Sequence, residues 1–344
     1  MLFMCPKSKL NIVIPMLIFA CAVMATPLIK AQSYPIHPII LVVSAPPGGG
    51  TDVSARTLAQ RLGEKLGQPV VVENKPGANA NIGAAQVARA KADGYTLLYT
   101  AQSPITIADQ LEPKITYDPV NDLLPVVLTQ ITPVIVVAPT SLGVKNLAEL
   151  VAYTKQNPNK TFYGSPGIGN ELHLDAELVR QALNIDTKHV PYRGSGPALL
   201  DLIAGRTQFM VASPSSVKGH ISEGRLVILA TLSKDRLPSY PNAPTAIESG
   251  YPQLTTEAWF GIFAPAKTSR TISALIRKAV MEVNSDLAYQ KQVSDLGMRP
   301  VAIPEDEFRD LIKDYRRTWR QLIDSGAISA SESPIPAPGA QPSR

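Results

Sequence analysis

The segment Ser44–Asp52 reads S-A-P-P-G-G-G-T-D and separates two runs of different character. Before it, Ile39–Val43 is a short run of apolar, mostly β-branched residues, which is typical of a buried strand. After it, apolar residues recur at helical spacing, at Ala55, Leu58, Leu62 and Leu66. The sequence therefore predicts a strand, a glycine-rich turn and a helix, in that order.

The same kind of junction is predicted at two further places. Gly164–His173 reads G-S-P-G-I-G-N-E-L-H, and Tyr192–Pro197 reads Y-R-G-S-G-P. Glycine lets backbone N–H groups approach a ligand closely, and a helix N-terminus offers unpaired donors with a partial positive charge. Ligands of open α/β sheets bind at the carboxyl ends of the strands. We therefore expect the three junctions to converge on one cleft and to hold a carboxylate there without a fixed positive charge.

A purely structural interpretation competes with this one. The polar residues of the junctions are all good helix N-caps: Thr51, Asp52, Asn170 and Ser195. For a single junction the capping role is favoured, whereas three junctions together favour binding. A nucleotide site is not indicated, because Gly48–Asp52 lacks the lysine of a phosphate loop and Leu172 stands where the third glycine of G-x-G-x-x-G would be.

Short apolar runs and helical patterns alternate along most of the chain. Further strands are predicted at Val70–Val72, Leu97–Tyr99, Val134–Val137, Phe162–Gly164, Phe209–Val211 and Val227–Ala230. Nearly continuous apolar strands that alternate with helices predict an α/β fold of mostly parallel sheets flanked by helices. Two long amphipathic helices are predicted near the end, at Ser269–Asp295 and Glu305–Asp324.

The first residues have the pattern of an export signal. Lys7 and Lys9 precede a mostly apolar run, and small residues stand before a predicted cleavage after Ser33. A lipoprotein acylated at Cys21 is the alternative, although Phe19 fits poorly before such a cysteine. Cleavage after Ser33 would remove both cysteines, so the mature chain would have no disulfide and no cysteine-bound metal. Residues 330–344, rich in proline and serine, are predicted to be a disordered tail.

The charge of the mature chain excludes one class of partner. The full chain has 33 Lys and Arg against 28 Asp and Glu, and the predicted signal contains three lysines and no acid, which leaves 30 − 28 = +2. The basic residues form no cluster along the sequence, so we expect no nucleic-acid partner.

Motifs of catalysis are missing from the sequence. It contains no G-x-S-x-G and no H-E-x-x-H, and no cysteine follows residue 33. His173 and Glu177 lie one helical turn apart and form at most half of a metal site. Trp259 is equally compatible with a wall of the cleft and with the core. We therefore predict a binding protein without catalytic activity, cofactor or metal.

Several longer motifs make the chain resemble one known family, the Bug (TctC-like) solute-binding receptors of tripartite tricarboxylate transporters. The resemblance extends from Tyr34 to about Ser329 and rests on P-P-G-G-G-T-D (Pro46–Asp52), G-Q-P-V-V-V-E-N-K-P-G-A (Gly67–Ala78), N-I-G-A (Asn81–Ala84), D-G-Y-T-L-L (Asp93–Leu98), Y-D-P-V (Tyr117–Val120), V-P-Y-R-G (Val190–Gly194) and W-F-G (Trp259–Gly261).

The resemblance implies a two-lobed periplasmic binding protein of the type with two crossover hinges. One lobe would comprise residues 34–133 and 259–329, and the other residues 134–258. The expected protein is a periplasmic monomer that captures a small carboxylate and meets the integral-membrane permease subunits of its transporter transiently. A sensor that presents its solute to a histidine kinase is the alternative, and a hydrolase or lyase on the same scaffold is a more distant one.

The ligand-binding residues follow from the junctions and from the family pattern. The predicted set is Ser44, Ala45, Pro46, Gly48, Gly49, Thr51, Asp52, Gln102, Ser103, Ser165, Gly167, Gly169, Asn170, His173, Tyr192, Gly194, Ser195, Ser213 and Trp259. The chain departs from the family at Asn170, where a serine is usual, and at Asn79 and Ala80, where glycines are usual. Ser213 lies where many members have an aspartate that could bind an amine, which argues against an amino-acid ligand.

Overall fold

The computed structural model describes residues 1, 34–48, 50–111 and 114–328. Every described helix and strand lies in one compact unit, His37–Arg344. The predicted signal segment after Met1, Gly49 and the predicted tail lie outside the described residues.

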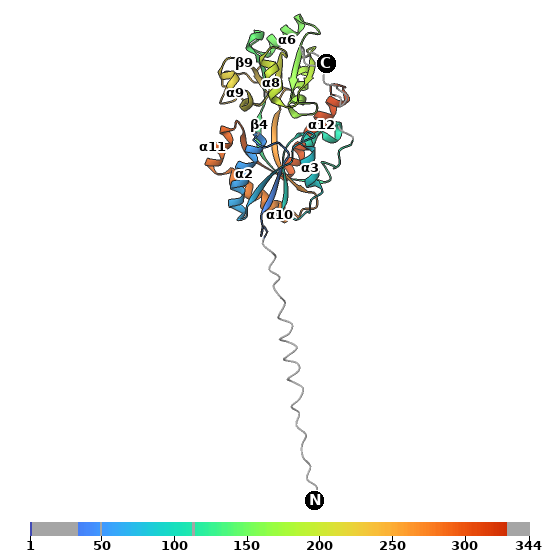
Figure 1. Cartoon of the computed structure of the whole chain (residues 1–344), viewed down its shortest axis with the longest axis vertical. Helices are drawn as coiled ribbons and strands as arrows, with labels where there is room; N and C mark the ends of the chain where they lie inside the picture. The colour runs from blue at the N-terminus through green and yellow to red at the C-terminus, as the bar shows by residue number, and fades with distance from the viewer. Residues whose placement is uncertain (2–33, 49, 112–113, 329–344) are drawn as a thin grey trace, which may run out of the picture. The chain divides into compact units, whose positions relative to one another are not determined.

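A six-stranded sheet forms the first lobe, and its strands come from both ends of this unit (Figure 1). The order across the sheet is β11-β4-β10-β3-β1-β2. The strands are β1 (Ile39–Val43), β2 (Val70–Asn74), β3 (Thr96–Ala101), β4 (Leu123–Pro133), β10 (Glu257–Pro265) and β11 (Arg299–Pro304). Strand β1 pairs in parallel with β2 and β3, whereas β10 runs antiparallel to β3 and β4, and β11 antiparallel to β4.

The middle of the chain forms a second, five-stranded sheet, coloured green to yellow in Figure 1. Its order is β7-β6-β8-β5-β9. The strands are β5 (Ile135–Pro139), β6 (Phe162–Ser165), β7 (Lys188–Pro191), β8 (Phe209–Ala212) and β9 (Leu226–Thr231). Strand β6 is parallel to β7 and β8, and β5 is antiparallel to β8 and β9.

The α/β two-lobed class is confirmed, but both sheets are mixed and not mostly parallel. The parallel pairs belong to units in which a helix connects the strands. Strands β4, β5 and β10 carry the chain between the two sheets, and two of them run against the parallel strands: β10 is antiparallel to β3, and β5 is antiparallel to β8. The exact lobe boundaries, at residues 133/134 and 258/259, stay a prediction.

Helices flank both sheets. The first sheet is flanked by α2 (Gly50–Leu66), α3 (Asn81–Ala88), α4 (Ser103–Thr106), α5 (Ala108–Leu111), α10 (Arg270–Asn284), α11 (Leu287–Asp295) and α12 (Glu305–Asp324). The second sheet carries α6 (Leu147–Gln156), α7 (Glu171–Ala182), α8 (Ser195–Ile203) and α9 (Pro214–Ser222), with a 3₁₀ turn at Thr140–Leu142. The predicted helix Ser269–Asp295 is in fact two helices, because Asp286 caps a new one by accepting from the N–H groups of Ala288 and Tyr289.

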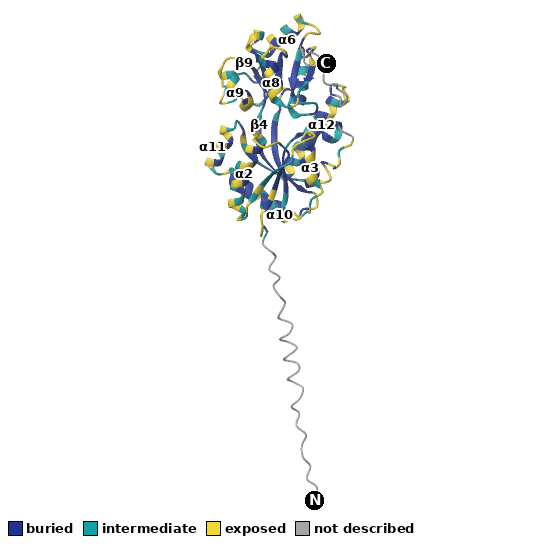
Figure 2. Cartoon of the chain, viewed as in Figure 1, coloured by how far each residue is buried: buried dark blue, intermediate teal, exposed yellow. Residues whose placement is uncertain are grey.

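The core of each lobe lies on its sheet, where the inner strands are mostly buried (Figure 2), whereas the edge strands β2 and β11 are partly exposed. In the first lobe, Trp259 meets Phe308 edge to face with ring centroids 5.1 Å apart. A third apolar cluster lies where α12 reaches α7, and it joins Trp319 and Leu322 to Leu174 and Leu111. This cluster fastens α12 to the second lobe.

Gly261 provides a test of the packing in the first lobe. A Cβ at this position would lie 2.5 Å from Cζ of Phe308, a ring that is fully buried. We expect Gly261→Ala to lower the free energy of unfolding by about 1–3 kcal/mol, because the ring cannot move without disturbing the core. Chemical denaturation measures the change. Gly219→Ala is the matched control, since its Cβ would enter open space on α9 and should be neutral or slightly stabilising.

Candidate functional site

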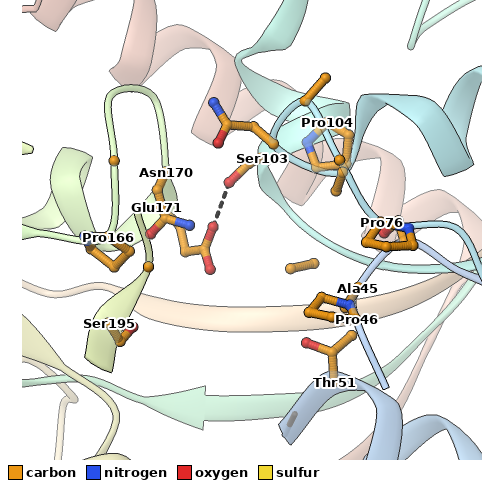
Figure 3. A pocket seen from close by; sticks show the side chains of 18 of the residues that line it. Ala45, Pro46, Thr51, Pro76, Ser103, Pro104, Pro166, Asn170, Glu171 and Ser195 are labelled. Atoms are coloured by element: carbon orange, nitrogen blue, oxygen red, sulfur yellow. Dashed lines mark hydrogen bonds between the residues drawn. The ribbon is translucent and has the colours of Figure 1, made fainter. Parts of the chain in front are cut away.

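A cavity of about 1080 Å³ lies between the two sheets (Figure 3). In the first lobe its walls are the loops that follow β1, β2 and β3, and in the second lobe they are the loops that follow β6 and β7. All five loops leave the carboxyl ends of strands, and each leads into a helix. The cavity therefore occupies the position at which ligands bind in open α/β sheets.

The loop after β1 is held in shape by Asp52. The carboxylate accepts from the N–H of Gly48 at 2.9 Å, from Nε of Arg56 at 3.0 Å and from Nδ2 of Asn74 at 2.8 Å. Burial would raise the pKa of Asp52, but these hydrogen bonds and the charge of Arg56 lower it to about 2. Asp52 is thus an internal brace of the loop, while Ala45, Pro46 and Thr51 line the cavity.

The loop after β2 is a fourth junction of the predicted kind, and the sequence interpretation missed it. Residues 76–80 line the cavity, and Ala78, Asn79 and Ala80 all have positive φ, at 48°, 48° and 72°. Three consecutive non-glycine residues in this region are uncommon, and such backbone is typical of functional loops. The signal in the sequence was Pro76-Gly77 between the strand at Val70–Asn74 and the helix that begins at Asn81.

The loop after β6 combines two glycines with an N-cap. Gly167 and Gly169 have φ of 147° and 73°, which favours glycine at both positions. Asn170 lines the cavity and also caps α7, because its side-chain oxygen accepts from the N–H of Leu172 at 3.0 Å. Both interpretations of Asn170, as a cap and as a residue of the cleft wall, are therefore compatible with its position.

The loop after β7 leaves a helix N-terminus open toward the cavity. Gly194 is the N-cap of α8, has φ of 106° and provides no side-chain cap. Its N–H donates to the carbonyl of Pro166 at 2.9 Å, which ties the two loops of the second lobe together. The N–H groups of the first turn of a helix have no intrahelical partner, so those of Ser195 and Gly196 are available to a ligand.

Two hydrogen bonds cross the cavity from one lobe to the other. Ser103 donates from Oγ to the carboxylate of Glu171 (Figure 3). Asn79 donates from Nδ2 to the carbonyl of Ile168 at 3.0 Å. Beside them, Leu111 lies so close to Gly169 that a Cβ there would be 2.9 Å from its Cδ1. The lobes therefore touch along the loop after β6, at Ile168, Gly169 and Glu171.

Two histidines stack beneath the loop after β6. The rings of His173 and His189 are 3.9 Å apart between centroids, and Tyr163 stacks on His189. Nδ1 of His173 accepts from the N–H of Gly169 at 3.2 Å, so the neutral ring carries its proton on Nε2. Burial, with the nearby charge of His189, lowers the pKa of His173 to about 2. His173 thus supports the loop as a neutral side chain.

Ser165 and His189 form a pair that the sequence interpretation did not anticipate. Ser165 Oγ lies 2.6 Å from Nε2 of His189, which is the distance of a nucleophile from its general base. Ser165 is fully buried and does not line the cavity, and its Oγ accepts from the N–H of Gly167 at 3.2 Å. The pair therefore shapes the glycine loop and offers no hydroxyl to a bound solute.

The structure brings many of the predicted residues together at the cavity. Those that line it are Ser44, Ala45, Pro46, Thr51, Ser103, Gly167, Asn170, Tyr192, Gly194 and Ser195. The other predicted residues within the described part of the chain do not line the cavity: they are Gly48, Asp52, Gln102, Ser165, Gly169, His173, Ser213 and Trp259. Gly49 lies outside the described residues. Trp259 is in the core, where it is 1% exposed, and Ser213 is the N-cap residue of α9.

The charged residues of the cavity were missed. Among the described residues that line it, only Glu171 and Arg193 are charged, and they stand at the N-termini of α7 and α8. Arg193, part of the quoted Y-R-G motif, adds a positive residue to the lining, and the expectation that a carboxylate is held without a fixed positive charge stays a prediction. Within the described part of the chain, no three His, Cys, Asp or Glu side chains gather at one place in a way that could hold a metal ion.

The burial of neutral His173 makes stability depend on pH. In the unfolded chain this histidine is protonated below about pH 6.5, whereas in the folded chain it stays neutral to about pH 2. The folded state is therefore destabilised as the pH falls below 6.5, by up to about 1.4 kcal/mol for each pH unit. By pH 5 the loss from this residue alone is about 2 kcal/mol.

His173→Asn tests this effect, because the amide oxygen can accept from the N–H of Gly169 but does not titrate. We expect the wild-type protein to lose about 2 kcal/mol more than the variant between pH 7 and pH 5, measured by urea denaturation at each pH. Equal losses in the two proteins would contradict the buried neutral histidine.

Comparison with known proteins shows the family. Residues 54–328 match the model of the family described as "Tripartite tricarboxylate transporter family receptor". The chain is 36% identical to Protein BugT of Bordetella pertussis, over 90% of this chain and 95% of that protein. Among the helices that the structure describes, none is long and apolar enough to cross a membrane.

Solved structures give the same result. The chain is similar to R. palustris Rpa4515 with adipate, with a TM-score of 0.77 and 30% identity over 86% of this chain and 99% of that one. It is also similar to MatC from Rhodopseudomonas palustris with bound malate, with a TM-score of 0.72 and 29% identity over 84% and 100% of the two chains. The resemblance inferred from the motifs is confirmed: the chain belongs to the tripartite tricarboxylate transporter receptor family and is a two-lobed solute-binding receptor.

Proposed function

We propose that this receptor captures a small organic carboxylate in the periplasm and delivers it to the membrane permease of a tripartite transporter. The observation that supports it best is that four helices, α2, α3, α7 and α8, have their N-terminal ends at one cavity. A residue at each of these ends lines the cavity, namely Thr51, Ala80, Glu171 and Ser195. Each end carries a partial positive charge and unpaired N–H donors, which suit an anion.

The arrangement is strong enough for a receptor. One helix N-terminus contributes about 0.3–1 kcal/mol, and each hydrogen bond to an ionised group about 1.5–3 kcal/mol. Several such bonds approach the roughly 8 kcal/mol that micromolar binding requires. Burial of the solute between the two lobes supplies the remainder.

The related structures support the same class of solute. One is described with adipate and another with malate, and both compounds are carboxylates. The family description names a transporter, and this supports a permease as the partner. Export to the periplasm agrees with the predicted signal at residues 1–33.

A thermal-shift screen tests the proposal on the purified mature chain. A carboxylate at 100 times its dissociation constant should add about 2.7 kcal/mol of stability and raise the melting temperature by several degrees. The panel contains mono-, di- and tricarboxylates, with neutral sugars as controls. A shift by sugars and by none of the acids would overturn the proposal.

Ser195 allows the open end of α8 to be tested by a matched pair of variants. Proline is well tolerated at the first position of a helix and lacks the N–H, so Ser195→Pro removes one donor from the cavity without breaking the helix. We expect it to weaken binding of the best carboxylate about tenfold or more, measured by calorimetry. Ser195→Ala keeps the N–H and should cost much less. If both variants bind alike, α8 does not hold the carboxylate.

A further inference from the structure

Glu171 is an acid placed in a cavity that is otherwise arranged for anions. It is the first residue of α7, lines the cavity and is partly buried. Its carboxylate extends across the cavity and accepts from Oγ of Ser103 in the other lobe (Figure 3). The side chain therefore faces the space that a solute between the lobes would fill.

Among the residues that the structure describes, no cation neutralises this carboxylate. Within the described part of the chain, Glu171 has Ser103 as its side-chain partner and takes part in no ion pair. Arg193 is the one cation among the described lining residues, and it is exposed and also forms no ion pair there. An ionised carboxylate at the start of a helix is favourable, so the helix itself keeps the charge in place.

A solute with an anionic group at each end would bring a second negative charge toward Glu171. Like charges that face each other across a binding site cost affinity and serve to reject wrong partners. An ammonium group would instead form a charge-assisted hydrogen bond with the same carboxylate. Among the described residues of the lining, one side chain is negative and one is positive, and this sum of zero matches a solute that is itself a zwitterion.

We infer that the receptor selects carboxylates that also carry an ammonium group, and that Glu171 determines this specificity by binding the ammonium. The inference rests on the proposed function, because the carboxylate of the same solute is held at the helix N-termini. The sequence argued against an amine on the ground that Ser213 replaces an aspartate. Glu171 supplies an acid from a different element, α7, and makes that aspartate unnecessary.

Pairs of acids that differ only at one end test the inference on the mature chain. The probes are 4-aminobutyrate with succinate, 5-aminopentanoate with glutarate, and 6-aminohexanoate with adipate. We expect the wild-type protein to bind the ammonium-bearing member of at least one pair about tenfold more tightly than the other member, by calorimetry. A preference for the member without the ammonium in every pair would overturn the inference.

Glu171→Gln separates the charge from the contact across the cavity, because the amide oxygen can still accept from Ser103. We expect this variant to lose about tenfold in affinity for the ammonium-bearing member, with no loss for its partner. An unchanged ratio would overturn the role of Glu171. Glu307→Gln is the matched control: Glu307 is also an acid in the first turn of a helix, α12, and is exposed away from the cavity lining.

Ser103→Ala is a second check, since it removes the contact and keeps the charge. It should weaken both members of a pair to the same extent and leave their ratio unchanged. Failure of this inference can be distinguished from failure of the proposed function. Binding of the dicarboxylates without the amino acids would overturn this inference alone, whereas binding of no acid in any pair would overturn the proposed carboxylate function as well.

Discussion

The passage of the chain between the two sheets is the constraint on which the site depends. Strand β4 ends at Pro133 and β5 begins at Ile135, so one residue separates a strand of the first sheet from a strand of the second. The chain returns from the second sheet to the first through β10, which lies inside the first sheet between β4 and β3. Because both passages are extended strands held within sheets, the loops after β1, β2, β3, β6 and β7 face one cavity from two sides. Every candidate ligand contact follows from this arrangement.

The backbone of these loops is shaped by side chains that do not face the cavity. Asp52 braces the first loop through Gly48, Arg56 and Asn74, and His173 supports the glycine loop of the second lobe through the N–H of Gly169. Both are buried, and the Asp52 carboxylate and Nδ1 of His173 hydrogen-bond within the protein. Binding by backbone groups needs this support, since an N–H donor is only as well placed as the turn that carries it. Asp52 and His173 therefore act on the backbone of the loops and do not line the cavity themselves.

The electrostatics of the cavity combine attraction and selection. The four helix N-termini provide positive partial charges, which arise from the peptide dipoles and not from a charged side chain. Glu171 and Arg193 add full charges at two of these ends. The contact of Glu171 with Ser103 also joins the lobes, so the same side chain takes part in closing the cavity and in determining its charge. A solute that satisfies Glu171 would replace or supplement a contact that already holds the lobes together.

The sequence alone determined what depends on neighbouring residues. The strand, glycine turn and helix around Ser44–Asp52, Gly164–His173 and Tyr192–Pro197 follow from local periodicity and from glycine's access to positive φ, and the family motifs name the receptor class. The tertiary structure decided which of these residues face the cavity. It placed Trp259 in the core and Asp52 in a brace, and it brought Glu171 to Ser103, 68 positions away in the chain. A contact such as that of Glu171 with Ser103 cannot be predicted from the local sequence, because it forms only when loops of two separate sheets come together.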